Sequence, residues 1–188
     1  ALKAGADLVV ELPLSWAMSG AERFAHGGVS LLQAFGCANS LVFGSECGNA
    51  ETLMHIANYL LSDRFSNDIK SPLSEGLSFA SARGKAIENA LGQEYAYLNE
   101  QPNNILGIEY CKAILAQGSS MKPLPILREG SYHDTTADAE NPSATSLRQL
   151  IERREPWGCY VPAAAQKVFD SAPVHTLVAG ERAILARL

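Results

Sequence analysis

The alternation of short apolar runs with longer segments of helical periodicity constrains the fold of this chain more than any other feature. Residues 7–13 have the mostly apolar character of a buried parallel strand that a proline ends. Apolar residues then recur at helical spacing over 20–35, Gly36 ends that segment, and 40–43 repeat the strand pattern. This order predicts a parallel strand-helix-strand unit, and hence an α/β fold with a doubly wound, mostly parallel sheet of Rossmann-like type.

The rest of the chain continues the alternation. We expect helices over residues 50–61, over 71–91 as one helix or as two broken near Gly76 and Gly84, and over 105–116, where Asn103 or Asn104 is available as a cap. A third strand is expected over 122–128, a polar loop over 129–142 and a further helix over 143–155. Loops after the carboxyl ends of parallel strands form the ligand site of such sheets. The segment from Gly44 to Asn49 is therefore a candidate ligand loop.

The domain organisation follows from the same patterns. Residues 1–160 are expected to form one α/β domain, whereas residues 161–188 have helical character alone and are expected to start a helical C-terminal region. Both ends look cut, because Gly5 closes what reads as the end of a helix, and 179–188 read as a helix without a stop signal.

Composition excludes several classes of function. The net charge of −5 and the pI of about 5.4 give no overall field that favours nucleic acid or an anionic membrane. No apolar run approaches the roughly 20 residues of a membrane helix. The four cysteines and four histidines lack metal-ligand spacing, so we expect no metal site and a reduced, cytoplasmic protein. The motifs of serine hydrolases, dinucleotide dehydrogenases and P-loop NTPases are absent from the sequence.

The run Ser143-Ala144-Thr145-Ser146-Leu147-Arg148 carries the sharpest chemical signal. Its three hydroxyls lie where the first-turn N–H groups of a helix are unpaired, which favours a phosphate, and Arg148 can close on that anion with a bidentate fork. The alternative is that Ser and Thr only cap the helix, as they commonly do. The position of the run, after a strand and a long polar loop, favours the phosphate site.

Five blocks in order resemble the bacterial tRNA(Met) cytidine acetate ligase family, within the nucleotidyltransferase superfamily. The blocks are Gly5 to Pro13, Leu41-Val42-Phe43-Gly44-Ser45-Glu46, Pro102-Asn103-Asn104-Ile105-Leu106-Gly107, Tyr132-His133-Asp134 and Ser143 to Arg148. The resemblance covers nearly the whole chain. It implies a nucleotidyltransferase-like ATP-binding domain over 1–160, in which 143–148 match the second phosphate motif of the superfamily. The first motif, of HxGH type, does not occur in the 188 residues and is expected before Ala1.

The resemblance also implies an activity and a set of site residues. The family joins acetate to AMP from ATP, releases pyrophosphate and acetylates the wobble cytidine of elongator tRNA(Met). The positions that match its ATP-binding residues are Gly44, Asn103 (with Asn104 as the alternative), Arg128, Ser143, Thr145, Ser146 and Arg148. His133 and Asp134 are candidates for proton transfer or for positioning of the cytidine amine. Mg²⁺ can accompany ATP through its phosphates.

Simpler interpretations of these residues remain open at this point. Gly44 can be a turn glycine, Arg128 a solvated strand-end arginine and either Asn a helix cap. Two other functions also remain open: a small-molecule adenylyltransferase of the same superfamily, and a non-catalytic RNA-binding domain. Because the HxGH-type motif is absent from the sequence, we expect these 188 residues alone to be inactive or nearly so.

Overall fold

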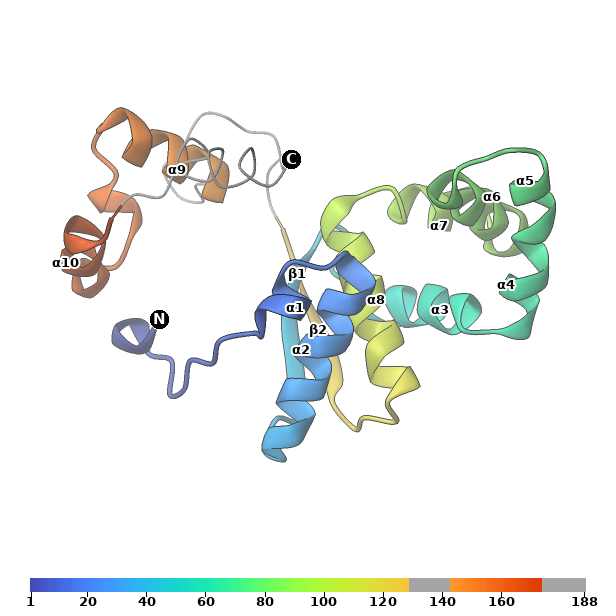
Figure 1. Cartoon of the computed structure of the whole chain (residues 1–188), viewed down its shortest axis with the longest axis horizontal. Coiled ribbons are helices and arrows are strands. Elements are labelled where there is room, and N and C mark those ends of the chain that lie inside the picture. The colour runs from blue at the N-terminus through green and yellow to red at the C-terminus, as the bar shows by residue number, and fades with distance from the viewer. Residues whose placement is uncertain (129–142, 174–188) are drawn as a thin grey trace. The chain divides into compact units, whose positions relative to one another are not determined.

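A computed structural model describes residues 1–128 and 143–173 (Figure 1). The chain divides into two compact units, which are described separately. The larger unit comprises residues 11–128, and the smaller comprises residues 1–10 and 129–188.

The larger unit contains a two-stranded parallel sheet. Strands β1 (Ser40–Ser45) and β2 (Lys122–Leu127) run side by side, with Ser40 opposite Lys122 and Gly44 opposite Ile126. Side chains alternate between the two faces of a strand. Leu41 and Phe43 therefore point to the covered face, whereas Val42 lies on the other face and is 55% exposed. The predicted second and third strands and the α/β class with parallel strands are confirmed.

Helix α8 (Pro102–Ala116) covers the inner face of the sheet, with α2 (Ala21–Phe35) packed against it (Figure 1). Ala25 and Val29 of α2 and Ile114 of α8 form a buried cluster that Leu41 of the sheet adjoins. The helix approaches the sheet closely at Gly107, where an added Cβ would lie 2.7 Å from the ring of Phe43. The short helix α1 (Leu14–Ala17) packs on α2.

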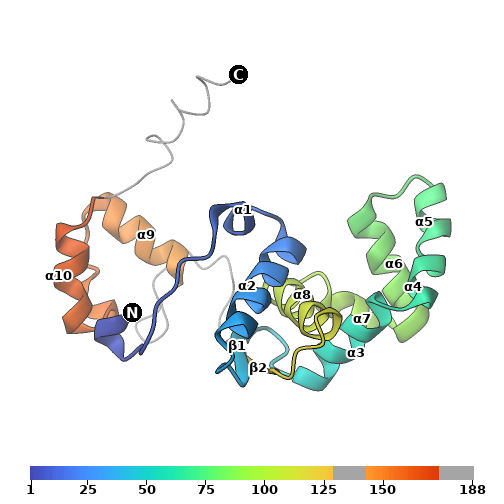
Figure 2. The same cartoon turned by 60° about the horizontal axis from the view of Figure 1, so that its bottom comes forward.

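The connection between β1 and α8 consists of helices joined by short turns and loops, as Figures 1 and 2 show. It contains α3 (Ala50–Leu60), α4 (Asp63–Asp68), α5 (Lys70–Ser74), α6 (Phe79–Leu91) and α7 (Gln93–Leu98). Asn49, Ser62 and Ser78 cap α3, α4 and α6, each by accepting a first-turn backbone N–H. A second buried cluster joins Leu53 and Ile56 of α3 to Ile87 of α6 and Ile108 of α8.

The smaller unit is helical in the part that the structure describes. It contains the 3₁₀ turns η1 (Leu2–Ala4) and η2 (Gly158–Tyr160) and the helices α9 (Ala144–Arg153) and α10 (Ala163–Ser171). Trp157 stacks edge-to-face on Phe169, and the side-chain amide of Gln166 donates to the Gly158 carbonyl at 2.7 Å. The predicted helix over 143–155 is confirmed to within two residues of each end.

Three predictions of local structure are wrong. Residues 7–13 are not a buried strand: they pair with no strand among the described residues, and Leu8 and Val9 are 64% and 55% exposed. An apolar run makes a strand only where another strand supplies its hydrogen bonds. Gly84 lies inside α6 without breaking it, whereas the expected break occurs at Gly76, which has φ 86°.

The third error concerns the start of α8. The helix begins at Pro102 rather than at residue 105, and neither Asn103 nor Asn104 caps it with its side chain. A proline suits the first helical position, because its missing N–H would be unpaired there in any case. The cap comes from elsewhere in the chain, as the next section describes.

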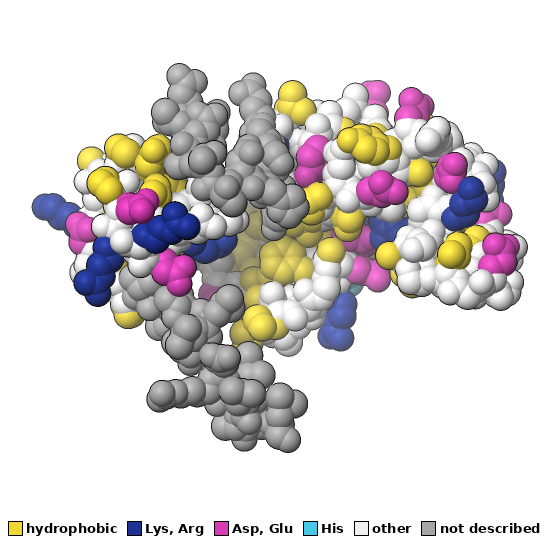
Figure 3. All heavy atoms as spheres, turned by 90° about the horizontal axis from the view of Figure 1, so that it is seen from above, with side chains coloured by type: hydrophobic (Ala, Val, Ile, Leu, Met, Phe, Trp, Pro, Cys, Tyr) yellow, Lys and Arg dark blue, Asp and Glu magenta, His cyan; other side chains and the backbone are white. Residues whose placement is uncertain are grey.

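Basic and acidic side chains are interspersed over the larger unit on the face that Figure 3 shows. No helix among residues 1–128 and 143–173 is long and apolar enough to cross a membrane.

Candidate nucleotide site

Three of the predicted site residues converge where β1 and β2 end and α8 begins. Gly44 lies near the end of β1, Arg128 follows β2 directly, and Asn103 lies in the first turn of α8. Nη1 of Arg128 donates to Oδ1 of Asn103 at 3.0 Å. The backbone N–H of Arg128 continues the sheet by donating to the Ser45 carbonyl at 2.9 Å. This edge of the sheet is where ligands bind in parallel α/β folds.

Gly44 makes room for the Arg128 side chain. A Cβ at Gly44 would lie 2.9 Å from Cδ of Arg128, which is closer than real Cβ contacts allow. The turn-glycine interpretation is thus replaced by a packing requirement, since Gly44 has ordinary strand geometry and belongs to β1. The arginine is exposed, and its bond to Asn103 is the one hydrogen bond that its side chain makes to the described residues. Its Nε and Nη2 edge is therefore available to an anion.

Glu46 supplies the cap of α8. Its Oε1 accepts the side-chain Nδ2 of Asn103 at 2.7 Å and the backbone N of Asn103 at 3.1 Å, while Oε2 accepts the backbone N of Asn104 at 2.7 Å. A carboxylate at this position satisfies unpaired N–H groups of the helix and complements the positive end of its dipole. This contact explains why no residue next to α8 in the sequence needs to cap it.

The environment of Glu46 favours its ionised form. Burial alone would raise its pKa, but hydrogen bonds from the Asn103 side chain and from backbone N–H groups outweigh that effect, so the pKa of Glu46 lies below its ordinary value of 4.5. Glu46 is therefore a carboxylate at neutral pH.

Asn104 has a structural role that differs from that of its neighbour. Its side chain is fully buried, and Oδ1 accepts the Ser45 hydroxyl at 2.7 Å and the backbone N of Cys47 at 3.1 Å. The Ser45 hydroxyl in turn accepts the backbone N–H groups of Cys47 and Gly48. Asn104 thus fixes the loop after β1 from inside, whereas Asn103 is half-buried and faces Arg128. The geometry favours Asn103 over Asn104 as a ligand contact.

The second predicted group of residues lies in the smaller unit, at the start of α9. Ser143 caps this helix by accepting the backbone N of Ser146 at 3.0 Å, and the buried Ser146 hydroxyl donates to the Ser143 carbonyl at 2.8 Å. Thr145 and Arg148 are exposed, and neither has a hydrogen-bond partner among residues 1–128 and 143–173. Ser143 is thus the N-cap of α9, and the Thr145 and Arg148 side chains have no partner in the described part of the chain. His133 and Asp134 lie outside the described residues.

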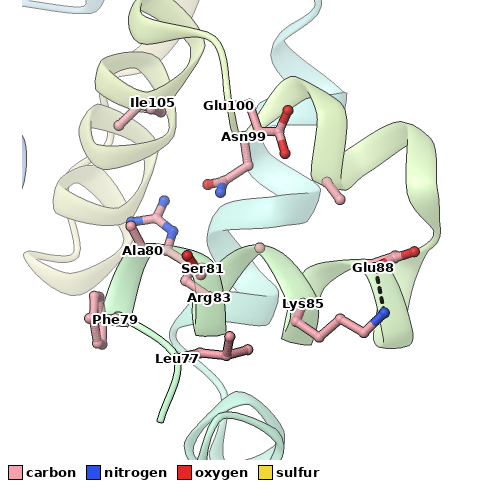
Figure 4. Close-up of a pocket in the computed structure, with 12 residues that line it drawn as sticks. Leu77, Phe79, Ala80, Ser81, Arg83, Lys85, Glu88, Asn99, Glu100 and Ile105 are labelled. Carbon is pink, nitrogen blue, oxygen red and sulfur yellow. Dashed lines mark hydrogen bonds and ion pairs between the residues drawn. The ribbon is translucent and has the colours of Figure 1, made fainter. Parts of the chain in front are cut away.

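A separate cavity of about 640 Å³ lies between α6, α7 and the start of α8 (Figure 4). Ile105 lines it, and because two residues turn an α-helix through about 200°, it faces away from Asn103. Within it Lys85 pairs with Glu88 at 2.9 Å. Arg83 binds Glu109, and its Nε and Nη2 are buried without a partner in the described part of the chain. None of the sequence-predicted site residues lines this cavity.

The role of Glu46 is not predicted from the sequence, although the block Leu41 to Glu46 contains this residue. An acidic residue directly after a strand was a usable signal, but its partners lie 57 and 58 positions away and are not readable from the sequence. Among the described residues, no group of three or more His, Cys, Asp or Glu side chains is placed to hold a metal ion.

Several curated relatives, all named tRNA(Met) cytidine acetate ligase, match most of this chain. A tRNA(Met) cytidine acetate ligase of Clostridium novyi (strain NT) is 40% identical over 157 residues, covering 81% of this chain and 39% of the relative. One of Caldanaerobacter subterraneus subsp. tengcongensis is 42% identical over 178 residues, covering 92% of this chain and 44% of the relative. The chain thus spans about two fifths of the length of these relatives. The resemblance expected from the five sequence blocks is confirmed.

Solved structures show the same relationship. The apo form I crystal structure of Thermotoga maritima TmcAL superposes with a TM-score of 0.82 at 31% identity, covering 89% of this chain and 42% of that one. A form II crystal structure of that protein bound with alpha-thio ATP gives a TM-score of 0.75 at 29% identity, covering 90% and 42%. The family model described as HIGH Nucleotidyl Transferase matches residues 1–184. The chain therefore belongs to the HIGH nucleotidyl transferase family.

Proposed function

We propose that this chain is the nucleotide-binding part of an ATP-dependent ligase that forms acetyl-AMP from acetate and ATP and acetylates the wobble cytidine of elongator tRNA(Met). The convergence of Gly44, Asn103 and Arg128 at the functional edge of the sheet carries the proposal. The names of the relatives and the alpha-thio ATP bound to a similar structure support it.

The proposed chemistry asks the protein to hold ATP more than to react with it. Acetate attacks the α-phosphorus in line with the departing pyrophosphate, and the charge that develops on the phosphate oxygens must be neutralised. Arg128 would supply positive charge and two N–H donors, and Asn103 would hold it in place. Gly44 would contribute to ATP binding by leaving the space in which the Arg128 side chain lies.

The start of α9, in the smaller unit, is proposed as a phosphate-binding turn in its own right. The exposed Thr145 hydroxyl and Arg148 guanidinium, with the first-turn N–H groups, are the chemistry that favours an anion at a helix N-terminus. Ser143 and Ser146 would contribute by shaping this turn. We further propose that His133 and Asp134 transfer a proton or position the cytidine amine. Mg²⁺ can accompany ATP through its phosphates.

The test uses the full-length protein that contains this chain. Incubation with ATP, radiolabelled acetate and an elongator tRNA(Met) transcript should yield labelled N4-acetylcytidine. A transcript whose wobble cytidine is replaced by uridine, and a reaction without ATP, should give none. Arg128→Met should reduce the yield, whereas Arg64→Met, at a solvent-exposed arginine of α4, should not.

Two results would redirect the proposal to the alternatives. Pyrophosphate release that is indifferent to tRNA and acetate would indicate a small-molecule adenylyltransferase. Binding of tRNA without ATP-dependent product would indicate a non-catalytic RNA-binding domain.

A further inference from the structure

The Asn103 amide must be turned one specific way to hold Arg128. Its Oδ1 accepts from Arg128 at 3.0 Å, so its Nδ2 points in the opposite direction, toward Glu46. An asparagine amide has an acceptor end and a donor end of nearly the same shape. A rotation of 180° would bring Nδ2 against the guanidinium, donor against donor, and would break the contact with Arg128. Something must therefore select between the two orientations.

We propose that Glu46 is the positioning residue that sets the Asn103 amide and, through it, Arg128 for nucleotide binding. An ionised carboxylate has acceptors only, so it bonds Nδ2 and repels Oδ1. Both of its oxygens are engaged at the start of α8, which fixes the carboxylate itself. The Glu46 carboxylate accepts from the Asn103 amide, and the Asn103 amide accepts from the Arg128 guanidinium. In each of these two hydrogen bonds only one partner can be the donor. This inference rests on the proposed function, because it concerns the same nucleotide site.

The surrounding bonds support a positioning role rather than direct contact with ATP. Glu46 is half-buried, and its oxygens are occupied by three N–H groups, at 2.7, 2.7 and 3.1 Å. A carboxylate would moreover repel the phosphates of a nucleotide. Ser45 and Asn104 immobilise the loop that carries Glu46, since the buried Asn104 amide binds both the Ser45 hydroxyl and the Cys47 backbone. The backbone of Glu46 is therefore held in a fixed position.

Glu46→Gln is the sharpest variant. It keeps the size and shape of the side chain but replaces one acceptor by a donor. The Nε2 group then faces either Asn103, where it no longer selects the amide orientation that holds Arg128, or the Asn104 backbone N–H, where it weakens the contact that fixes the side chain of residue 46. We expect the KM for ATP and the ATP dissociation constant of the full-length protein to rise on the order of tenfold, with kcat within about twofold of the unchanged protein.

Two controls separate positioning from structural damage. Glu51→Gln makes the same chemical change at an exposed glutamate in the first turn of α3, where the side chain has no hydrogen-bond partner among the described residues, and it should leave ATP affinity unchanged. Ser78→Ala removes the cap of α6, which is far in the sequence from Gly44, Asn103 and Arg128. It should lower thermal stability as much as Glu46→Gln does, without raising the KM for ATP.

A double-mutant cycle with Asn103 decides whether Glu46 acts through it. Asn103→Ala should raise the ATP dissociation constant on the order of tenfold, and Glu46→Gln combined with Asn103→Ala should raise it by no more than Asn103→Ala alone. Effects of the two changes that multiply would overturn the inference, as would a normal ATP affinity in Glu46→Gln. A fall in kcat with an unchanged KM would also overturn it, because it would indicate only a loss of folded enzyme.

The outcome is distinguishable from failure of the proposed function. If the unchanged protein binds ATP but makes no acetylcytidine, the proposed activity is wrong, and calorimetric ATP affinities of the variants still decide the role of Glu46. If the unchanged protein does not bind ATP at all, both proposals are wrong.

Discussion

The side chain of Arg128 crosses the backbone of Gly44 so closely that a Cβ at Gly44 would lie 2.9 Å from its Cδ and 3.1 Å from its Cγ. The glycine therefore determines where the arginine can lie. In this position Arg128 reaches Asn103 and leaves one edge of its guanidinium toward solvent.

Gly44→Ala should weaken ATP binding with little loss of stability. The methyl group displaces the flexible Arg128 side chain, which can move at a cost below about 1 kcal/mol, but the displaced guanidinium no longer meets Asn103. Calorimetry should show an ATP dissociation constant raised on the order of tenfold. Gly84→Ala, where an added Cβ meets nothing within 4 Å, is the control and should bind ATP normally. Unchanged affinity in Gly44→Ala would show that the position of Arg128 is unimportant.

Glu46 should make stability depend on pH in the acid range. Because its pKa is lowered in the folded state, its contribution is complete above the unfolded value near 4.5 and is lost as the pH falls through the folded pKa. Urea unfolding should show the unchanged protein more stable than Glu46→Gln by about 1 kcal/mol at pH 7. This difference should shrink as the pH falls below 4.5 and through the lowered pKa of Glu46. A difference that is constant over this range would contradict the prediction.

Gly27 and Gly84 both lie inside helices but should respond to alanine in opposite ways. A Cβ at Gly27 of α2 would overlap the indole ring of Trp16, so Gly27→Ala must displace α1 and should lower the free energy of unfolding by about 1–3 kcal/mol. Gly84→Ala meets open space in α6 and should raise it by about 0.5–1 kcal/mol, because alanine is the better helix former. Chemical denaturation of the two variants side by side checks the opposite signs.

The buried ion pair between Arg83 and Glu109 should matter more to stability than the exposed pair between Lys85 and Glu88. The Glu109 side chain is 2% exposed, and Arg83→Met leaves it with Lys112 as its one remaining partner in the described part of the chain. Two unpaired donors of Arg83 disappear with the same change, which offsets part of the cost, so we expect a loss of about 2 kcal/mol.

Lys85→Met is the matched control for Arg83→Met, since it removes a cation from the same helix. Its pair with Glu88 is 50% and 40% exposed, so the loss should be below about 0.5 kcal/mol. Equal losses of stability in the two variants would refute the distinction between the buried and the exposed pair.

The sequence predicted well those elements whose pattern is local. Strands at 40–43 and 122–128 and the helix at 20–35 follow from apolar periodicity and from Gly36, which takes the left-handed conformation that ends a helix. The strand expected at 7–13 failed because a strand depends on a partner that periodicity does not reveal. A break at Gly84 is open in the sequence because glycine is a poor helix former, yet α6 is continuous and buries Ala82, Ala86 and Ile87.

The candidate site was predictable only in part, because its contacts join residues that are far apart in the sequence. Gly44, Asn103 and Arg128 were identified by resemblance, and the structure brings them together. The distinction between Asn103 and Asn104 depends on which side of α8 each occupies relative to the loop after β1, and both fit the sequence pattern equally. The role of Glu46 could not be predicted, because its function lies in contacts with a helix start far along the chain.

The long helical connection between β1 and α8 has a kinetic consequence. The hydrogen bonds that join the loop after β1 to the start of α8 connect residues far apart in the sequence. Glu46 and Asn103 are 57 positions apart, and Ser45 and Asn104 are 59 positions apart. Helices α3 to α7 can form from local contacts. The bonds between the loop after β1 and α8 require closure of the whole connection, which the loss of chain entropy opposes. We therefore expect the bonds at the start of α8 to form later in folding than the helices of the connection.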